Sequence, residues 1–308
     1  MTNNDYAVEV HNLIVDFGGF KAVNDVTFNV NKGEIFGFLG ANGAGKTTTI
    51  RVLCGILRPT SGDVKVAGFS FAGDGANAIK SAVGYMSQKF TLYNDLSVIE
   101  NLDFTAAIRQ IPKQVYLERR DRLLKFIGFD RSLSTKVQDL PGGTKQQVSL
   151  VAAMIHDPQI IFLDEPTAGV TPGARKRFWN LIRELAKSGK TVFVTTHYMD
   201  EAEECGRVAL MKDGKIIALD SPAKLKASAF KYPILNLTPK DGAIDVKEFK
   251  ALPAFESFAA YGLNYHAVIG NYDEWTKIKD RIHSLFRVSE ITPTLEDVFI
   301  HYVLGVNP

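Results

Sequence analysis

The first thirty residues alternate between apolar and polar positions in the way typical of β-strands. Apolar side chains recur at Val8, Val10 and Leu13, and the alternation resumes from Val23 to Val30 after the turn sequence FGGF. A period of two places these side chains on one face of a sheet, so two strands joined by a tight turn are expected. The N-terminal part therefore predicts a small antiparallel β unit.

From Ile35 onward, short apolar runs alternate with segments of helical spacing. The runs IFGFL, IIFLD and TVFVTT are almost uninterrupted, which is typical of strands buried on both faces. Helices are expected at 45–57, 172–187 and 198–204. Strands that alternate with helices in this way predict an α/β fold with a mostly parallel sheet covered on both faces.

Two regions depart from this alternation. Between about 92 and 156 the strand patterns vanish, and three consecutive helical patterns predict a helical insertion between two strands of the sheet. Residues 231–308 predict a separate small α/β domain, because the strand-like runs PILNLT and LNYHAVIG precede apolar residues at helical spacing. Its last helix is expected to begin near Thr294, with Asp297 completing an N-terminal capping pair.

Aromatic residues and cysteines are assigned to packing. Tyr265 and Trp275 in the C-terminal region carry no chemical motif and are expected in its core, with dimer stabilisation or regulation as weaker alternatives. The two cysteines, Cys54 and Cys205, have no metal-like neighbours, so packing is expected for both.

Composition and charge exclude several classes of protein. With 308 residues, 45% of them apolar, the chain can bury a large core. The net charge of +2, with both signs mixed, gives no basic field that would indicate nucleic acid as a partner. No apolar run approaches the ~18 residues of a membrane-spanning helix. The start MTNNDYAVEV lacks the order of a secretory signal, and a cytosolic location is expected.

Candidate chemistry begins at GANGAGKTT, residues 40–48, which follows the predicted strand IFGFL and opens a helix. A phosphate-binding loop requires this context, because glycines let backbone N–H groups converge on phosphate oxygens. Lys46 supplies positive charge near the β- and γ-phosphates, and the Thr47 hydroxyl can coordinate Mg²⁺. The nucleotide-binding residues expected in this loop are Gly40, Asn42, Gly43, Gly45, Lys46, Thr47 and Thr48.

Further polar residues follow the ends of predicted strands. The run IIFLDEP ends in Asp164, expected beside the metal, and Glu165, expected to orient and polarise the attacking water. His197 follows TVFVTT and is expected to hydrogen-bond the γ-phosphate. Gln88 follows the short strand in VGYMSQ, where its amide can reach the metal or the water. The predicted catalytic set is therefore Lys46, Gln88, Glu165 and His197.

The ordered motifs GANGAGKTT, Gln88, LPGGTKQQ, IIFLDEP and His197 resemble the nucleotide-binding domain of ATP-binding cassette (ABC) transporters, over about residues 5–228. The segments TLYNDLSVIENLDF, THYMDEAE and TPTLEDVFIHYVLG look like those of bacterial drug- and polysaccharide-export ATPases whose permeases are separate chains. The resemblance implies a P-loop ATPase fold, and ATP and Mg²⁺ as cofactors. It also implies that Phe17 stacks on adenine, with a core position as the alternative.

The resemblance further implies partners and a location. Two such domains sandwich two ATP molecules, and they attach to an integral membrane permease at the cytoplasmic face of the cell membrane. The permease contact is expected in the groove between the segment after Gln88 and the helical insertion. Phe90, Leu92 and Tyr93 are candidates for contact with a short docking helix. Packing inside the insertion is the alternative, and it is favoured for Leu92.

Two segments depart from the family pattern at the expected dimer interface. In LPGGT, Pro141 and Thr144 stand where the family usually has the serine and the glutamine of Leu-Ser-Gly-Gly-Gln, whereas Gly142 and Gly143 remain to contact the opposite subunit's ATP. Proline removes a hydroxyl and a backbone donor, and a lost hydrogen bond to a charged phosphate costs about 1.5–3 kcal/mol. In TAGVTPG, Thr171 stands where the family usually has aspartate.

These departures leave several functions open. One hypothesis is that the chain hydrolyses ATP at its own loop but closes its partner's site weakly, so that the partner is a different ATPase domain. The alternative is a homodimer that tolerates both changes. A soluble cassette of DNA repair or translation would show two cassettes or a coiled-coil insertion, and one phosphate loop without a heptad run argues against it. A regulatory cassette without turnover is disfavoured by Glu165 and His197.

Overall fold

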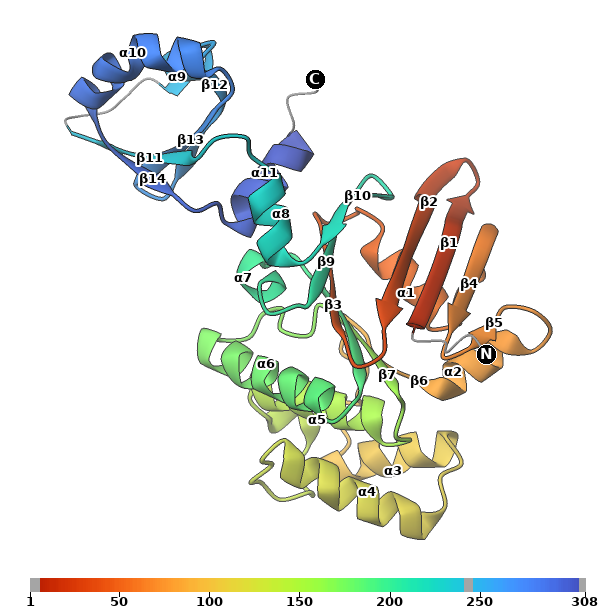
Figure 1. The fold of residues 1–308 in the computed structure, drawn as a ribbon. Coiled ribbons are helices and arrows are strands. Elements are labelled where there is room, and N and C mark those ends of the chain that lie inside the picture. Colours follow the sequence, from red (N-terminus) through yellow and green to blue (C-terminus); the bar gives the residue numbers. More distant parts are fainter. Residues whose placement is uncertain (1–5, 241–245, 305–308) are drawn as a thin grey trace. The chain divides into compact units, whose positions relative to one another are not determined.

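An antiparallel sheet formed by the N-terminal residues is the first element of the structure (Figure 1). The structure is a computed structural model that describes residues 6–240 and 246–304. The sheet has the strand order β2-β1-β4-β5, with β1 (Tyr6–Phe17), β2 (Phe20–Asn31), β4 (Ser61–Val66) and β5 (Phe69–Ser70). Alternate side chains of β1 and β2, among them Val8, Val10 and Val23, are fully buried. The predicted antiparallel unit is confirmed, and β4 and β5 extend it.

A six-stranded sheet carries the strands that the apolar runs predicted. Its order is β10-β9-β3-β8-β7-β6, and the pairings β9–β3, β3–β8, β8–β7 and β7–β6 are parallel. The strands are β3 (Ile35–Leu39), β6 (Val83–Met86), β7 (Ile160–Asp164), β8 (Thr191–Thr196), β9 (Arg207–Lys212) and β10 (Lys215–Asp220). Every residue of β7 and β8 is buried. This two-sided burial explains why these strands read as uninterrupted apolar runs.

Helices connect the strands of this sheet. They are α1 (Lys46–Leu53), α2 (Gly75–Ala82), α6 (Pro172–Lys187) and α7 (Met199–Ala202). The prediction for α6 matches its bounds, and α7 is shorter than predicted. The prediction of a helix over 45–57 was wrong at its end, because Gly55 has a φ of 70° and ends the helix. A Cβ at Gly55 would also lie 2.5 Å from the carbonyl oxygen of Ala76.

The helical insertion is confirmed. Residues 92–156, all of them described, contain no strand and hold α3 (Val98–Ile108), α4 (Lys113–Phe126), the short 3-10 helix η1 (Val137–Asp139) and α5 (Gly142–Met154). Pro141 directly precedes α5, and its carbonyl oxygen accepts a hydrogen bond from the Lys145 N–H at 2.9 Å. The missing N–H of Pro141 therefore costs the helix nothing. A Cβ at Gly143 would lie 2.7 Å from the Cβ of Ala174, so glycine is what allows α5 to approach α6 this closely.

The C-terminal part forms a compact unit of its own. Its sheet has the order β12-β13-β11-β14 with antiparallel pairings. Its elements are α8 (Pro222–Ser228), β11 (Ile234–Pro239), α9 (Val246–Lys250), β12 (Phe255–Tyr261), β13 (Asn264–Ile269), α10 (Tyr272–Leu285), β14 (Phe286–Ile291) and α11 (Leu295–Leu304). Trp275 is buried in the core and Tyr265 packs half-buried against it. Thr294 and Asp297 form the predicted capping pair, with Asp297 Oδ2 accepting from the Thr294 N–H at 2.8 Å.

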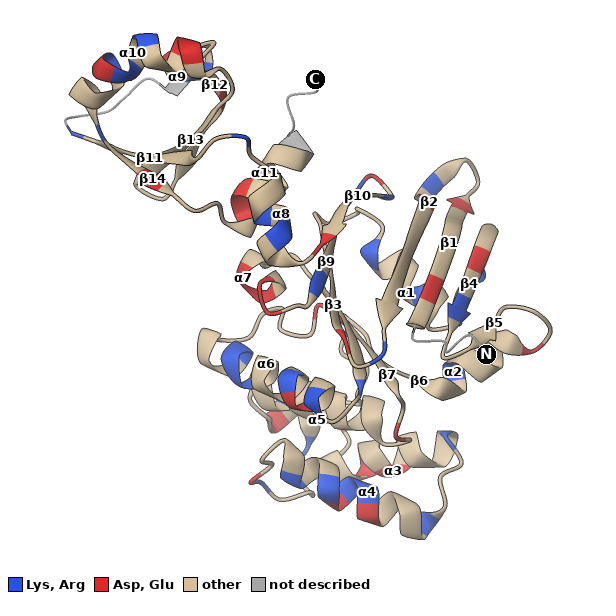
Figure 2. Cartoon of the chain, in the orientation of Figure 1, with Lys and Arg blue, Asp and Glu red and all other residues tan. Residues whose placement is uncertain are grey.

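The chain divides into the compact units Met1–Leu219 and Asp220–Pro308. This division falls inside the 5–228 segment, and the functional assignment of the two parts stays a prediction. None of the helices in the described residues is long and apolar enough to cross a bilayer. Lys, Arg, Asp and Glu are interspersed along α4 and α6 (Figure 2). Cys54 and Cys205 are both buried and unoxidised, as expected for packing residues.

Candidate functional site

A cleft of about 500 Å³ opens between the β1–β2 turn and the predicted phosphate loop. It is lined by Phe17, Phe20, Ala22, Asn42, Gly43, Gly45, Lys46, Thr47, Thr48, Gln88 and Glu165. Most of the predicted nucleotide-binding residues therefore meet at one place, at the carboxyl end of β3. The side chain of Phe17 is 54% exposed, so the alternative of a core position for it was wrong. Phe20 lies opposite Phe17 across the hairpin, and no motif had indicated it.

Glycine is required at three positions of the loop for different reasons. Gly43 and Gly45 have φ values of 83° and 106°, a region that disfavours other residues. A Cβ at Gly45 would lie 2.5 Å from the carbonyl oxygen of Ala22, and one at Gly40 would lie 2.4 Å from that of Met211. Around Gly43 no atom lies within 4 Å of such a Cβ. Gly40 and Gly45 thus allow the loop to pack closely against the backbone of Met211 and Ala22, whereas Gly43 borders the open cleft.

Lys46, the first residue of α1, is 5% exposed although it carries a charge. Its Nζ donates to the carbonyl oxygens of Gly40 at 2.8 Å and Ala41 at 3.1 Å. Glu165 Oε1 lies 3.8 Å from the same nitrogen. Burial lowers the pKa of Lys46, and the nearby carboxylates of Glu165 and Asp164 oppose that shift. The ammonium group is therefore held at the loop in a poorly solvated position, where additional negative charge would stabilise it.

Asp164 ends β7 and is 1% exposed. Its Oδ1 accepts hydrogen bonds from the hydroxyls of Thr195 at 2.6 Å and Thr47 at 3.2 Å. Burial raises the pKa of Asp164, and these two donors counteract the shift. A carboxylate and a hydroxyl that converge in this way are hard oxygen ligands of the kind Mg²⁺ prefers. The pair Thr47 and Asp164 therefore fits the predicted metal site.

Glu165 lies at the centre of the remaining contacts. Its φ is 49°, in the left-handed region, and its N–H donates to the carbonyl and hydroxyl oxygens of Thr195 at 3.2 and 3.0 Å. Its Oε2 accepts from Gln88 Nε2 at 3.0 Å and lies 3.2 Å from His197 Nδ1. An unusual backbone conformation held by neighbouring groups is typical of functional sites. The structure thus brings Gln88, Glu165 and His197 together, although they come from three separate segments.

The residues predicted to act on a second subunit lie elsewhere. Gly142 and Gly143 are at the start of α5 and are not among the residues that line the cleft. A Cβ at Gly142 would meet no atom within 4 Å. Thr171 is exposed and directly precedes α6 without a capping hydrogen bond from its side chain. Their placement outside the cleft leaves both segments accessible for another molecule.

Sequence reasoning missed two residues, Thr195 and Tyr85, whose side chains contact the carboxylates of the site. Thr195 donates to Asp164 and accepts from Glu165, and it is fully buried. Tyr85 in β6 approaches Asp164 Oδ2 with its hydroxyl at 3.5 Å, and burial raises the pKa of that hydroxyl. The polar ending of TVFVTT was the signal for Thr195, since a buried hydroxyl at a strand end needs a partner.

Comparison with known proteins shows the family to which the chain belongs. The sequence pattern of the family described as "ABC transporter" matches residues 23–168. The chain is 42% identical over 228 residues to the "Probable multidrug ABC transporter ATP-binding protein YbhF" of Escherichia coli (strain K12), covering 74% of this chain. The match spans 39% of that relative's length. This chain is also 32% identical to the "Nod factor export ATP-binding protein I" of Rhizobium leguminosarum bv. viciae, and the match covers 96% of this chain and 94% of the relative.

Solved structures show the same fold. The structure of cbiO1 from Clostridium perfringens, part of the ABC transporter complex cbiONQ, matches with a TM-score of 0.67 and 28% identity, over 73% of this chain and 92% of that one. The ATP-binding cassette MJ0796, solved as a dimer bound to ADP and Pi, matches with a TM-score of 0.62 and 25% identity, over 70% and 98%.

The phosphate loop between β3 and α1, with a strand ending in carboxylates beside it, defines a P-loop nucleotide-binding ATPase fold. With a relative that matches over nearly its whole length, the chain belongs to the ABC transporter family, as one of its ATP-binding proteins.

The raised pKa of Asp164 leads to a prediction about stability without nucleotide. A raised pKa means that folding disfavours the charged carboxylate, so Asp164→Asn should raise the free energy of unfolding at neutral pH. The gain should be small below the ordinary aspartate pKa of about 3.9 and should grow as the pH rises through the raised value. Each unit of that shift corresponds to about 1.4 kcal/mol.

Urea unfolding in EDTA from pH 4 to 7 measures this difference. Asp63→Asn, which changes an exposed aspartate on β4, serves as the matched control and should change the free energy little. A destabilised Asp164→Asn protein at pH 7 would contradict the prediction.

Proposed function

We propose that the chain binds ATP with Mg²⁺ and hydrolyses it to power transport, in the direction of export, through a separate integral membrane permease. In this proposal residues 5–228 form the nucleotide-binding domain, residues 231–308 form an accessory domain, and the permease holds the chain at the cytoplasmic face of the cell membrane. The observation that carries the catalytic part is the convergence of Gln88 and His197 on Glu165 beside the phosphate-loop cleft. The names of two relatives, which describe multidrug transport and Nod factor export, support the transport part.

The binding half of the site is assigned to the loop and the β1–β2 turn. Backbone N–H groups of the loop and the Lys46 ammonium are placed to neutralise phosphate charge. The exposed ring of Phe17 offers a flat apolar surface for adenine. Thr47 and Asp164 would hold Mg²⁺, with the Gln88 amide as a further ligand in the proposal. When bound, the ion would neutralise charge on the phosphate oxygens.

The catalytic half is assigned to Glu165 and His197. Glu165 can accept a proton from a water molecule as that water attacks the γ-phosphate. The Nδ1 atom of His197 faces Glu165 at 3.2 Å, which leaves Nε2 for a hydrogen bond to the γ-phosphate. The Gln88 amide donates to the same Glu165 oxygen, Oε2, at 3.0 Å. Two groups, Gln88 and His197, thus hold the Glu165 carboxylate in a defined geometry. In the proposal, His197 also orients the reacting phosphate.

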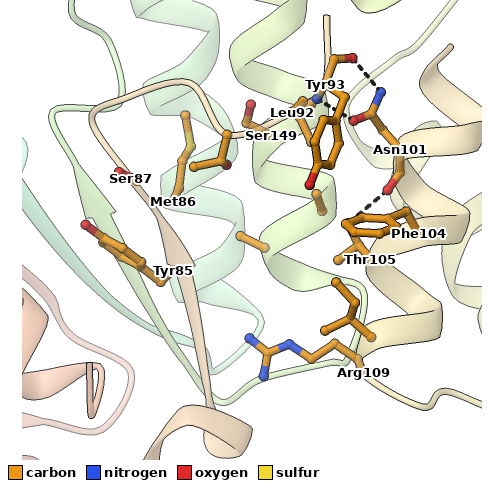
Figure 3. Close-up of a pocket in the computed structure, with 14 residues that line it drawn as sticks. Tyr85, Met86, Ser87, Leu92, Tyr93, Asn101, Phe104, Thr105, Arg109 and Ser149 are labelled. Atoms are coloured by element: carbon orange, nitrogen blue, oxygen red, sulfur yellow. Dashed lines mark hydrogen bonds between the residues drawn. The ribbon is translucent and has the colours of Figure 1, made fainter. Parts of the chain in front are cut away.

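The permease contact is proposed at a pocket in the helical insertion. Its volume is about 210 Å³, and the end of β6, the segment after Gln88, α3 and α5 supply its walls (Figure 3). The side chains of Tyr93 and Phe104 are 53% and 44% exposed, and their rings meet edge to face with centroids 5.2 Å apart. Asn101 fixes the segment by accepting from the Tyr93 N–H at 2.7 Å (Figure 3). Leu92 lines the pocket half-buried, and Phe90 is half-buried outside it.

These exposed aromatic side chains fit the apolar face of a short helix. Grooves with exposed apolar side chains bind the apolar face of an amphipathic helix. The partner in the proposal is therefore a cytoplasmic helical segment of the permease, and the alternative that Tyr93 packs inside the insertion is contradicted by its exposure.

A second ATPase domain is the other proposed partner. A family relative of known structure is a dimer bound to ADP and Pi, which supports pairing of cassettes. The starts of α5 and α6, with Pro141 and Thr171, lie outside the cleft and carry the proposed contact surface. The N–H groups of Gly142 and Gly143 remain available at a helix N-terminus, which favours anions. These features are compatible with a homodimer and with a heterodimer whose other subunit is a different ATPase domain.

Replacement of Glu165 tests the ATPase function. Glu165→Gln should reduce the ATP turnover of the purified chain at least about a hundredfold, because general-base catalysis is lost, while bound ATP is retained. Turnover and the nucleotide content of the purified protein are the measurements. Glu118→Gln, on the exposed face of α4, is the matched control and should leave turnover unchanged. Unchanged turnover in Glu165→Gln would refute the catalytic assignment.

A charge in the pocket tests the permease contact. Phe104→Asp should abolish copurification of the tagged chain with an integral membrane protein from detergent-solubilised membranes, since a carboxylate at a buried apolar contact costs several kcal/mol. Phe69→Asp, with a comparable exposure of 45% but outside the pocket, should retain the membrane partner. ATP binding should remain the same in both variants. Equal retention by both variants would exclude this surface as the contact.

Restoring a hydroxyl tests the effect of Pro141. Pro141→Ser in the Glu165→Gln background should strengthen ATP-dependent dimerisation about tenfold or more, since a hydrogen bond to a charged group contributes about 1.5–3 kcal/mol. Sedimentation with and without ATP gives the dissociation constants. An unchanged dissociation constant would show that Pro141 does not weaken closure of the dimer.

The heterodimer hypothesis has a separate test. Fast and cooperative ATP turnover by the unmodified chain alone would contradict it.

A further inference from the structure

An aromatic ring lies directly beside the proposed catalytic histidine. The ring of Tyr198 is 4.1 Å from the ring of His197, centroid to centroid, at an interplanar angle of 36°. The guanidinium carbon of Arg175, on α6, lies 3.8 Å from the centroid of the Tyr198 ring. A cation within about 6 Å of an aromatic face is attracted to it. Arg175, Tyr198 and His197 therefore form a contiguous stack that leads to Glu165.

The cation in this stack is anchored by carboxylates. Arg175 Nε lies 3.3 Å from Glu201 Oε1, and Arg175 Nη1 lies 3.5 Å from Asp200 Oδ2. The Glu201 side chain is only 1% exposed. Its second oxygen accepts from the Thr196 hydroxyl at 2.7 Å, and Oε1 accepts from the Thr167 hydroxyl. A buried carboxylate needs such partners. The guanidinium group supplies opposite charge to Glu201, although its Nε atom makes no hydrogen bond.

The backbone on either side of His197 is held by the same network. The Thr196 hydroxyl that donates to Glu201 also accepts from the Tyr198 N–H at 3.0 Å. The His197 side chain itself is 40% exposed and is not held by burial. Its orientation toward Glu165 therefore depends on this turn and on the neighbouring ring of Tyr198.

We propose that Arg175 and Tyr198 are positioning residues that hold the His197 imidazole against Glu165. Arg175 lies one turn after Thr171, at the start of α6, and its backbone N–H donates to the Thr171 carbonyl oxygen at 2.9 Å. The stack therefore connects the segment assigned to the second ATPase domain with the catalytic histidine. The role assigned to Arg175 and Tyr198 rests on the proposed ATPase function.

Kinetic variants of the full chain test this role. Arg175→Ala and Tyr198→Leu should lower kcat about tenfold or more, because small misplacements of catalytic groups are costly, while KM for ATP stays within about twofold. Tyr198→Phe keeps the ring and should keep kcat. Lys176→Ala, an exposed cation on the same helix, is the matched control and should also keep kcat. A loss of kcat in Tyr198→Phe equal to that in Tyr198→Leu would refute the role of the ring.

A double variant separates positioning from general destabilisation. If Arg175 acts through His197, Arg175→Ala should lower kcat no further once His197 has been replaced by alanine. Multiplicative losses in His197→Ala/Arg175→Ala would overturn the proposal. Absence of turnover in the unmodified chain would instead count against the proposed function.

A spectroscopic measurement tests the positioning role even if the unmodified chain shows no ATP turnover. The chain contains six histidines, and in the ¹⁵N-histidine NMR spectrum His197→Gln identifies the signals of His197. Without nucleotide, Arg175→Ala should shift the Nδ1 signal of His197 away from its value in the unmodified chain, whereas Lys176→Ala should not. An unchanged Nδ1 signal in Arg175→Ala would refute the positioning role whether or not the chain hydrolyses ATP.

Discussion

Two adjacent buried carboxylates at the end of β7 are the constraint on which the rest of the site depends. Asp164 and Glu165 are 1% and 8% exposed, and each buried ion costs several kcal/mol unless partners compensate it. Lys46, 3.8 Å from Glu165, supplies opposite charge, and Thr195 holds both residues. Burial nevertheless raises the pKa of Asp164 and lowers that of Lys46. The protein alone compensates these charges incompletely, and phosphate groups with a bound cation would complete the balance.

The strands that support these carboxylates were the most predictable part of the fold. β3, β7 and β8 are covered on both faces, so their sequences are continuously apolar and stand out without any tertiary information. β14, with the sequence FRVSEI, has a single buried residue and mixes charged with apolar residues. Its place in a sheet depends on pairing with β11, which no local pattern reveals. The early end of α1 is set by Gly55, whose φ of 70° ends the helix and whose backbone lies close to Ala76.

The candidate site divides in the same way. Lys46, Thr47, Asp164 and Glu165 lie in short motifs whose chemistry is local, so sequence alone identified them. Thr195 on β8 contacts Asp164 at the end of β7, and Arg175 on α6 contacts Tyr198 after β8. These contacts depend on the fold, and a single threonine, tyrosine or arginine has no distinctive pattern. Gln88 was identified by its position, but its bond to Glu165 required the fold.

The packing of α5 against α6 explains one of the two glycines in the LPGGT segment. Gly143 is needed for the close approach of α5 to Ala174 on α6, independently of any nucleotide. Its presence is therefore explained by the fold and does not by itself indicate a functional contact with a second ATP. Pro141 does not destabilise α5 either, because the helix begins one residue after it. The same helix α6 carries Arg175, which reaches the ring beside His197. A partner bound at the N-terminal ends of α5 and α6 could move one helix against the other. The contacts of Arg175 and Tyr198 would then transmit this movement to His197. Through α6, the cleft residues and the departing LPGGT segment are thus parts of one coupled structure.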